Sequence, residues 1–122
     1  MSTTVDDTAF VAKVIDVAPG GKAVNINDAI SALSYRNNAP SPLTYTPGEK
    51  VNMVLETAPI EWIVPAGHRI RVDISSSNYP AYHAHSNYAG IWALQTKTRK
   101  ARQTLYFGPG VPSYVELPVY RD

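Results

Sequence analysis

Serine, histidine and aspartate, the side chains of acyl-transfer chemistry, occur together in one stretch of the chain: His68, Asp73 and the three serines at 75–77. A catalytic triad requires the serine hydroxyl to contact the imidazole and the imidazole to contact the carboxylate. The stretch alternates apolar and charged residues as a strand does, and a strand rises about 3.3 Å per residue. His68 and Ser75 would then lie roughly 23 Å apart along that strand. We therefore expect no triad within this stretch.

A second pattern of serine catalysis is the sharp turn Gly-x-Ser-x-Gly, which exposes a nucleophilic serine between a strand and a helix. The glycines of this chain are at positions 20, 21, 48, 67, 90, 108 and 110, and no two are four residues apart. The sequence therefore predicts that this chain has no catalytic residues and is not an enzyme by itself.

Two histidines are spaced as metal ligands can be. In an extended segment His83 and His85 would lie on the same side, but zinc sites use three or four protein ligands. The chain has no cysteine, so a third ligand would have to be His68 or a distant carboxylate. The alternative, which we prefer, is two histidines in a polar loop. We expect no metal and no cofactor.

Aromatic side chains offer a third kind of chemistry, the stacking of flat rings on sugar faces. The candidates for such a platform are Trp62, Trp92, Tyr79, Tyr82 and Tyr88. The alternative is that these rings fill the core or pack on a neighbouring domain. Trp and Tyr suit positions where one end of the side chain is buried and the other contacts solvent.

Charge and composition restrict the partners. The basic run at 97–102 carries four positive charges, but the net charge of the chain is only +1. Such a run is typical of a solvated strand edge, so we expect neither nucleic acid nor a membrane as a partner. No apolar run approaches the roughly 18 residues of a membrane-spanning helix. Residues 1–6 lack the basic start and apolar core of a signal peptide, which favours the cytoplasm.

The elements that must position these residues are mostly strands. The 122 residues fit a single domain, 1–122, with a flexible terminus at 1–6. Residues 10–17 are apolar on both faces, so both faces should be covered. A turn at 19–22 leads to a return strand. We expect that strand to continue through Ile30 with a bulge, whereas the alternative is a helical turn that begins at Asn27.

Further strands are indicated by alternating residues at 51–55, 70–74, 103–107 and 114–119. In the strand 70–74 we expect Ile70, Val72 and Ile74 to be buried. The charged residues Arg69, Arg71 and Asp73 should then face solvent. The total of about seven or eight short strands separated by turns predicts an all-β fold, a β-sandwich.

Two blocks of the sequence carry a family resemblance. Residues 65–71 read Pro-Ala-Gly-His-Arg-Ile-Arg and residues 75–80 read Ser-Ser-Ser-Asn-Tyr-Pro. Residues 7–17 read Asp-Thr-Ala-Phe-Val-Ala-Lys-Val-Ile-Asp-Val. In this order, and over nearly the whole chain, they resemble the C-terminal domain of the X-Pro dipeptidyl-peptidase and cocaine-esterase-like serine hydrolases.

The resemblance implies a non-catalytic, jelly-roll-like (galactose-binding-like) β-sandwich. It would support an α/β-hydrolase domain, which cleaves amide or ester acyl groups, and would shape its substrate cleft. The loop 78–90 would face that domain, although its His-x-His departs from the Asn/Asp-rich loop of the family. The candidate partner-facing residues are Asn78, Tyr79, Tyr82, His83, His85 and Trp92.

The resemblance also implies that the domain starts before Asp7, so that the first strands of the sandwich would be lacking. Exposed strand edges template pairing with another chain. We therefore expect the isolated chain to form a homodimer that buries the strand 10–17 and Trp62 or Trp92. The alternatives are a stand-alone carbohydrate- or ligand-binding sandwich and a small assembly protein.

Overall fold

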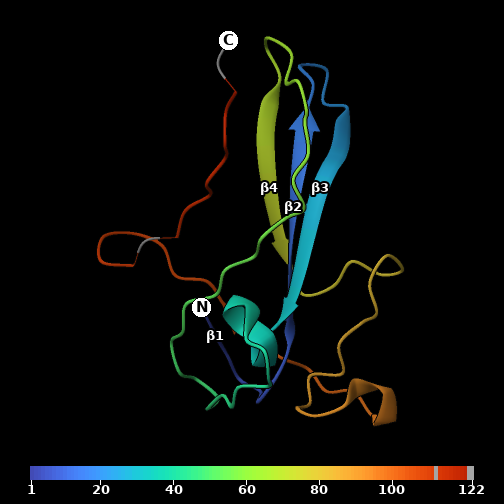
Figure 1. Ribbon diagram of the computed structural model, residues 1–122, viewed down its shortest axis with the longest axis vertical. Helices are drawn as coiled ribbons and strands as arrows, with labels where there is room; N and C mark the ends of the chain where they lie inside the picture. The colour runs from blue at the N-terminus through green and yellow to red at the C-terminus, as the bar shows by residue number, and fades with distance from the viewer. Residues whose placement is uncertain (112, 121–122) are drawn as a thin grey trace.

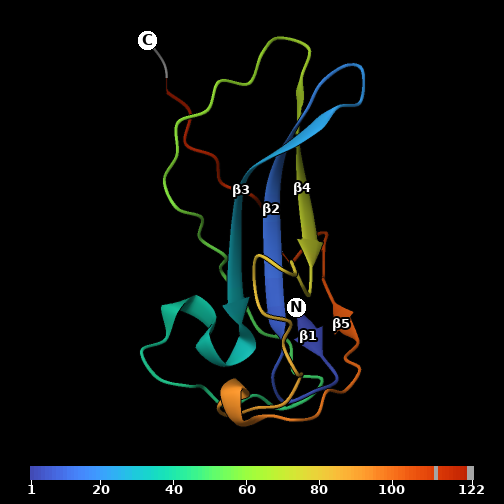
Figure 2. The ribbon, with the colours of Figure 1, turned by 90° about the vertical axis from the view of Figure 1, so that its right-hand side faces the viewer.

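The computed structural model describes residues 1–111 and 113–120, and its regular elements there are almost entirely antiparallel strands (Figures 1 and 2). One sheet has the order β3-β2-β4 and the other pairs β1 with β5. In chain order the elements are β1 (Ser2–Thr3), β2 (Ala9–Val17), β3 (Ala23–Ala32), the 3-10 helix η1 (Leu33–Asn38), β4 (Arg69–Ser75), the 3-10 helix η2 (Trp92–Leu94) and β5 (Gln103–Thr104). This architecture confirms the all-β class and is consistent with a sandwich, whereas the jelly-roll-like connection stays a prediction.

The central strand β2 is buried on both faces, as its sequence predicts. Phe10 and Ala12 on one face are 2% and 9% exposed, and Val11 and Ile15 on the other are 0% and 6% exposed. The alternation of a strand sends these pairs to opposite sides. Because a single chain already covers β2, a dimer cannot use this strand as its interface, which corrects the expected dimer surface.

The connection between β2 and β3 is a hairpin. The backbone N–H of Ala18 donates to the carbonyl of Lys22 at 2.9 Å, and Gly21 turns back with a φ of 86°. Glycine adopts this left-handed conformation at no steric cost. Strand β3 continues to Ala32, and the ladder shifts register opposite Val14 and Ile15. A continuous strand with a bulge is therefore confirmed over the helical turn.

Strand β4 overturns part of the predicted core. Ile70 and Ile74 are 44% and 43% exposed, and Val72 is only half-buried. Arg69 and Arg71 are exposed as predicted, but Asp73 is half-buried like Val72. The predicted burial is wrong because the apolar face of β4 is only partly covered by the rest of the described chain. Alternation identifies the apolar face but cannot say whether another layer covers it.

Several expected strands are extended segments without a ladder. Residues 51–57 alternate between half-buried and exposed, yet they join neither sheet in the described part of the chain. Val115, Leu117 and Val119 are 56%, 43% and 77% exposed and also lie outside the sheets. The described residues thus form five strands instead of seven or eight.

The N-terminal residues, expected to be flexible, are packed in the structure. Ser2 and Thr3 pair with Thr104 and Gln103, and Val5 is 4% exposed. The Tyr45 hydroxyl accepts a hydrogen bond from the backbone N–H of Thr3 at 3.0 Å. Within the residues described, no helix has the length and apolarity needed to cross a bilayer.

Candidate functional site

A buried carboxylate, Asp7, joins three parts of the chain. Asp7 is 2% exposed. Its Oδ1 accepts hydrogen bonds from the backbone N–H groups of Thr8 and Ser34, both at 2.9 Å. Its Oδ2 accepts a hydrogen bond from the Ser34 hydroxyl at 2.7 Å. A buried carboxylate needs such donors to offset its lost hydration, so the arrangement fastens η1 to the strand that follows Asp7.

A histidine from the candidate loop completes this cluster. The Nε2 atom of His85 lies 3.6 Å from Asp7 Oδ2. The backbone N–H of Asn87 donates to His85 Nδ1 at 2.9 Å, so the ring proton of neutral His85 is on Nε2 and faces the carboxylate. Burial by itself raises the pKa of Asp7. The His85 and Ser34 hydrogen bonds outweigh burial, and the pKa is lowered.

The Asp7 cluster contains a serine, a histidine and an aspartate, but it is not a catalytic triad. In a triad the serine hydroxyl donates to the histidine, which acts as its base. Here the Ser34 hydroxyl donates to Asp7 and therefore has no base. The cluster is therefore a structural junction. Sequence reasoning did not pair Asp7 with Ser34 because 27 positions separate them.

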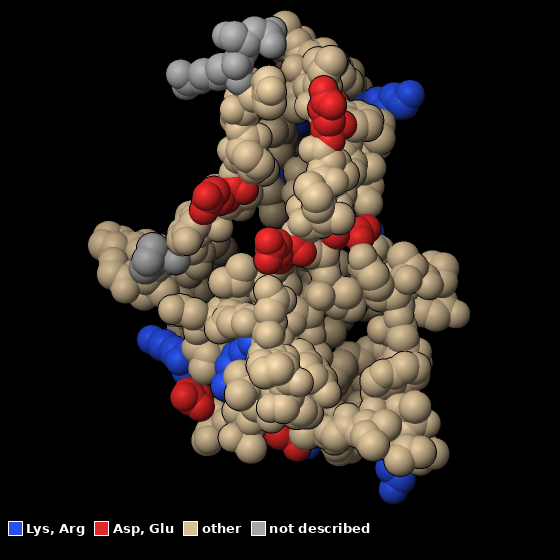
Figure 3. Space-filling model, viewed as in Figure 1, with Lys and Arg blue, Asp and Glu red and all other residues tan. Residues whose placement is uncertain are grey.

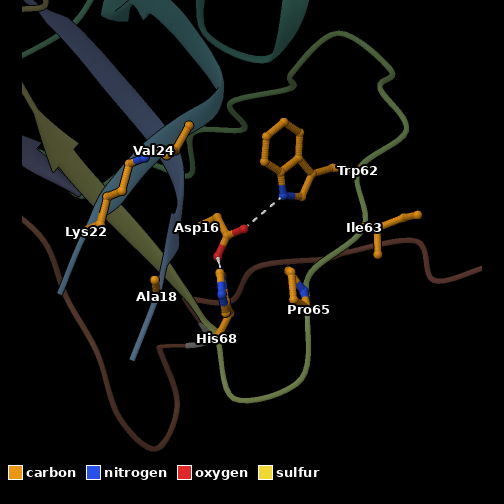
Figure 4. A pocket seen from close by; sticks show the side chains of 8 residues that line it. All are labelled: Asp16, Ala18, Lys22, Val24, Trp62, Ile63, Pro65 and His68. Atoms are coloured by element: carbon orange, nitrogen blue, oxygen red, sulfur yellow. Dashed lines mark hydrogen bonds and ion pairs between the residues drawn. The ribbon is translucent and has the colours of Figure 1, made fainter. Parts of the chain in front are cut away.

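A second carboxylate, Asp16, fastens the Pro65–Gly67 turn to β2 (Figure 4). His68 Nδ1 lies 2.7 Å from Asp16 Oδ1, and the Trp62 indole N–H donates to Oδ2 at 3.1 Å. Burial raises the pKa of Asp16, but the hydrogen bonds from His68 and Trp62 outweigh it and the pKa is lowered. A cavity of about 270 Å³ lies beside the cluster and is also lined by Lys22, Val24 and Pro65. Both carboxylate oxygens are occupied, so the cluster positions a turn instead of offering a free acid.

Asp16→Asn is expected to lower the melting temperature at neutral pH, because an amide cannot accept from both donors and carries no charge. The lowered pKa of Asp16 means that its contribution is present above its unfolded-state pKa of about 4 and is lost as the pH falls through the folded-state pKa. Thermal melts of both proteins at pH 7 and pH 3 test this, and their difference should shrink at pH 3. A difference that grows toward low pH would contradict the assignment.

Two of the candidate loop residues point inward and anchor the loop to the sheet. The Asn78 side chain donates to Asp28 Oδ2 of β3 at 3.4 Å, and the Tyr82 hydroxyl donates to the other oxygen of the same carboxylate. This hydrogen bond is the main cause of the raised pKa of Tyr82. Together with His85 on Asp7, these contacts make half of the candidate residues anchors and not contact residues.

The other three candidates lie on the outside of the loop. His83 stacks on Trp92 of η2, with 4.5 Å between ring centroids and an interplanar angle of 32°. Trp92 is 56% exposed and Tyr79 is 75% exposed. His83 and His85 thus diverge, and among the described residues no three His, Asp or Glu side chains are grouped closely enough to hold a metal.

The basic run supplies another anchor of the same loop. Arg99 donates from Nε to the carbonyl of Asn87 at 2.7 Å, lies 4.2 Å from the centre of the Tyr88 ring and pairs with Asp6. This arginine is therefore a structural residue, not part of an anion-binding surface. On the face shown in Figure 3, acidic and basic side chains are scattered and leave wide uncharged areas between them.

The five aromatic residues considered for sugar stacking do not share a surface. Trp62 contacts Asp16 near the β2–β3 turn, whereas Trp92 belongs to η2 at the opposite end of the molecule (Figures 1 and 2). Tyr82 and Tyr88 contact Asp28 and Arg99. A single aromatic platform is not formed.

Comparisons with known proteins cover nearly the whole chain. Residues 1–116 match the family model described as the X-Pro dipeptidyl-peptidase C-terminal non-catalytic domain. The chain is 32% identical over 123 residues to the cocaine esterase of Rhodococcus sp. (strain MB1 Bresler). The alignment covers 99% of this chain and 21% of the relative, so the chain spans about a fifth of the length of that curated protein.

Proposed function

Because the chain belongs to the family of X-Pro dipeptidyl-peptidase C-terminal non-catalytic domains, we propose that it supports a hydrolase domain of the same polypeptide and shapes its substrate cleft. The hydrolase would cleave acyl peptide or ester bonds, as the names of the family and of its esterase relative suggest. The comparisons do not support the alternative of a stand-alone carbohydrate- or ligand-binding module.

The observation that carries this proposal is an exposed apolar surface on an anchored loop. We call it the outer loop surface and define it by Tyr79, His83, Ile91, Trp92 and Leu94. Ile91, Leu94 and Tyr79 are 68%, 76% and 75% exposed, and Ile91 and Leu94 lie within two residues of the exposed Trp92 in the chain. Contiguous apolar patches on a protein surface mark interaction sites, and aromatic residues are enriched at the centres of interfaces.

The anchoring of the loop strengthens the argument. Tyr82, His85 and Arg99 tie it to Asp28, Asp7 and Asp6. A loop that is already fixed loses little conformational entropy when it packs against a partner. The outer loop surface is therefore suited to a permanent contact with a neighbouring domain.

The test is a chimera in which this chain replaces the 123 aligned residues of the Rhodococcus cocaine esterase. We expect an active esterase with one cooperative unfolding transition. Trp92→Asp or Leu94→Asp should lower its melting temperature or split the transition, because a buried unpaired carboxylate is costly. The matched control is Tyr120→Asp, which changes a side chain that is 96% exposed and lies outside the loop. If the loop variants melt as the control does, the loop does not face the hydrolase domain.

We also infer that the isolated chain forms a homodimer. The exposed apolar side chains of β4, Ile70 and Ile74, support this inference, because they lie on the same face of the sheet as the buried Phe10. Self-association would cover part of this face.

A further inference from the structure

The outer edge of β4 has no backbone partner in the described residues. Strand β2 occupies the inner edge over the whole length, from Arg69 to Ser75. No backbone hydrogen bond from another described segment reaches the outer edge. The strand forms one side of the sheet in both views (Figures 1 and 2). An open edge of this length is a template for pairing with a further strand.

The sequence of β4 is self-complementary about its central residue. If two copies pair antiparallel around a two-fold axis with Val72 opposite Val72, then Arg71 lies opposite Asp73 of the second copy, twice. Ile70 likewise lies opposite Ile74. Directly opposite residues share one face of an antiparallel pair, so charges meet charges on one face and apolar side chains meet on the other.

The other registers are unfavourable. A shift of two residues in one direction places Asp73 opposite Asp73, and like charges opposite each other destabilise a pair. The same shift in the other direction places Arg71 opposite Arg71, and although Arg69 then lies opposite Asp73, only residues 69–73 remain paired. A shift of one residue turns the isoleucines toward the charged face. The register centred on Val72 is therefore the one that β4 specifies for its own copy.

We propose that two copies of this chain pair through the outer edges of β4 in this register, so that their two three-stranded sheets become one continuous sheet. This proposal rests on the homodimer inferred above and adds its interface. In one copy Arg71 and Asp73 already form an ion pair at 3.0 Å, with side chains 53% and 46% exposed. Exposed ion pairs contribute little by themselves, so both groups are free to turn to their cross-strand partners. Ile70 and Ile74, which are exposed in one copy, become neighbours of the same residues in the other.

The charges give a test that separates contacts between chains from contacts within a chain. Arg71→Asp alone places the introduced carboxylate opposite Asp73 of the second copy, and Asp73→Arg alone places Arg71 opposite an arginine. Each variant should remain monomeric at a concentration where the unmodified 13.3 kDa chain is dimeric by light scattering. Mixing the two variants should restore a dimer, because each pair across the interface is then complementary. Within each variant the 71–73 pair stays like-charged, so only an intermolecular contact can be rescued.

A crosslink tests the register. The chain has no cysteine, so Val72→Cys introduces one thiol, and a two-fold pair at position 72 brings the two Cα atoms to about 4.5–5.5 Å, within disulfide range. Oxidation should give a covalent dimer of Val72→Cys but not of the control Ile74→Cys, whose opposite residue is Ile70. Circular dichroism would confirm that all variants are folded.

Three outcomes would overturn the proposal: a monomer at all concentrations, a dimer that the charge variants do not weaken, and a mixture of the two variants that does not dimerise. The second outcome would leave the homodimer standing with another interface. None of them bears on the hydrolase-facing loop, because the chimera tests that surface independently.

Discussion

Asp7→Ala is expected to cost about 3–5 kcal/mol of unfolding free energy, because it removes the buried acceptor of three hydrogen bonds. The substitution leaves the buried N–H groups of Thr8 and Ser34 and the Ser34 hydroxyl without their acceptor. Each unsatisfied buried donor costs about 1–3 kcal/mol. It also removes the carboxylate that the Nε2 atom of His85 faces. Urea denaturation monitored by circular dichroism measures the loss.

Two further variants control this prediction. Asp7→Asn keeps one acceptor oxygen, so its cost should be intermediate. Ser34→Ala removes one hydroxyl donor and keeps the backbone contact, so it should cost least. Because the pKa of Asp7 is lowered on folding, its contribution should be present above its unfolded-state pKa of about 4 and lost as the pH falls through the folded-state value. A cost of Asp7→Ala below that of Ser34→Ala would show that the junction is not stabilised by the carboxylate.

Phe10→Ala is expected to cost about 3–5 kcal/mol, because it removes a large side chain from the core and leaves a cavity. Phe10 is 2% exposed on the central strand β2. The matched control is Ile70→Ala, an apolar truncation on the same face of the sheet at a position that is 44% exposed. It should cost clearly less in the monomer, since part of that side chain is already hydrated. Equal costs would show that a second layer covers β4.

Local patterns predicted the elements that depend on near neighbours. The apolar run of β2, the turn at Gly21 and the bulged return strand were all readable because each is specified within about ten residues. The burial of Ile70 and Ile74 was not, because periodicity identifies a face and burial depends on what packs against it. The incomplete cover over β4 decided that outcome.

The candidate site residues also divide into those that the local sequence predicts and those whose orientation depends on distant residues. The sequence pointed to Tyr79, His83 and Trp92 as partner-facing residues. All three are exposed, and their contact with a partner stays a prediction. The inward direction of Tyr82 and His85 depends on Asp28 and Asp7, which lie 54 and 78 positions away in the chain. No spacing rule connects such pairs. The motif at residues 7–17 carried the family resemblance. That Asp7 accepts hydrogen bonds from Ser34 depends on the fold, because the two residues are 27 positions apart.

The pairing of Ser2 with Thr104 has a consequence for the order of events during synthesis. The β2–β3 hairpin can form as soon as residues 9–32 leave the ribosome, whereas β4 must wait for residue 75. Of the five described strands, β1 emerges before the others but acquires its partner last, because β5 ends at Thr104. Contacts of such long sequence separation slow folding, since loop closure is costly before the contacts form. Strand β1 therefore stays unpaired while β2, β3 and β4 are made, and its sheet is completed only when β5 has been translated.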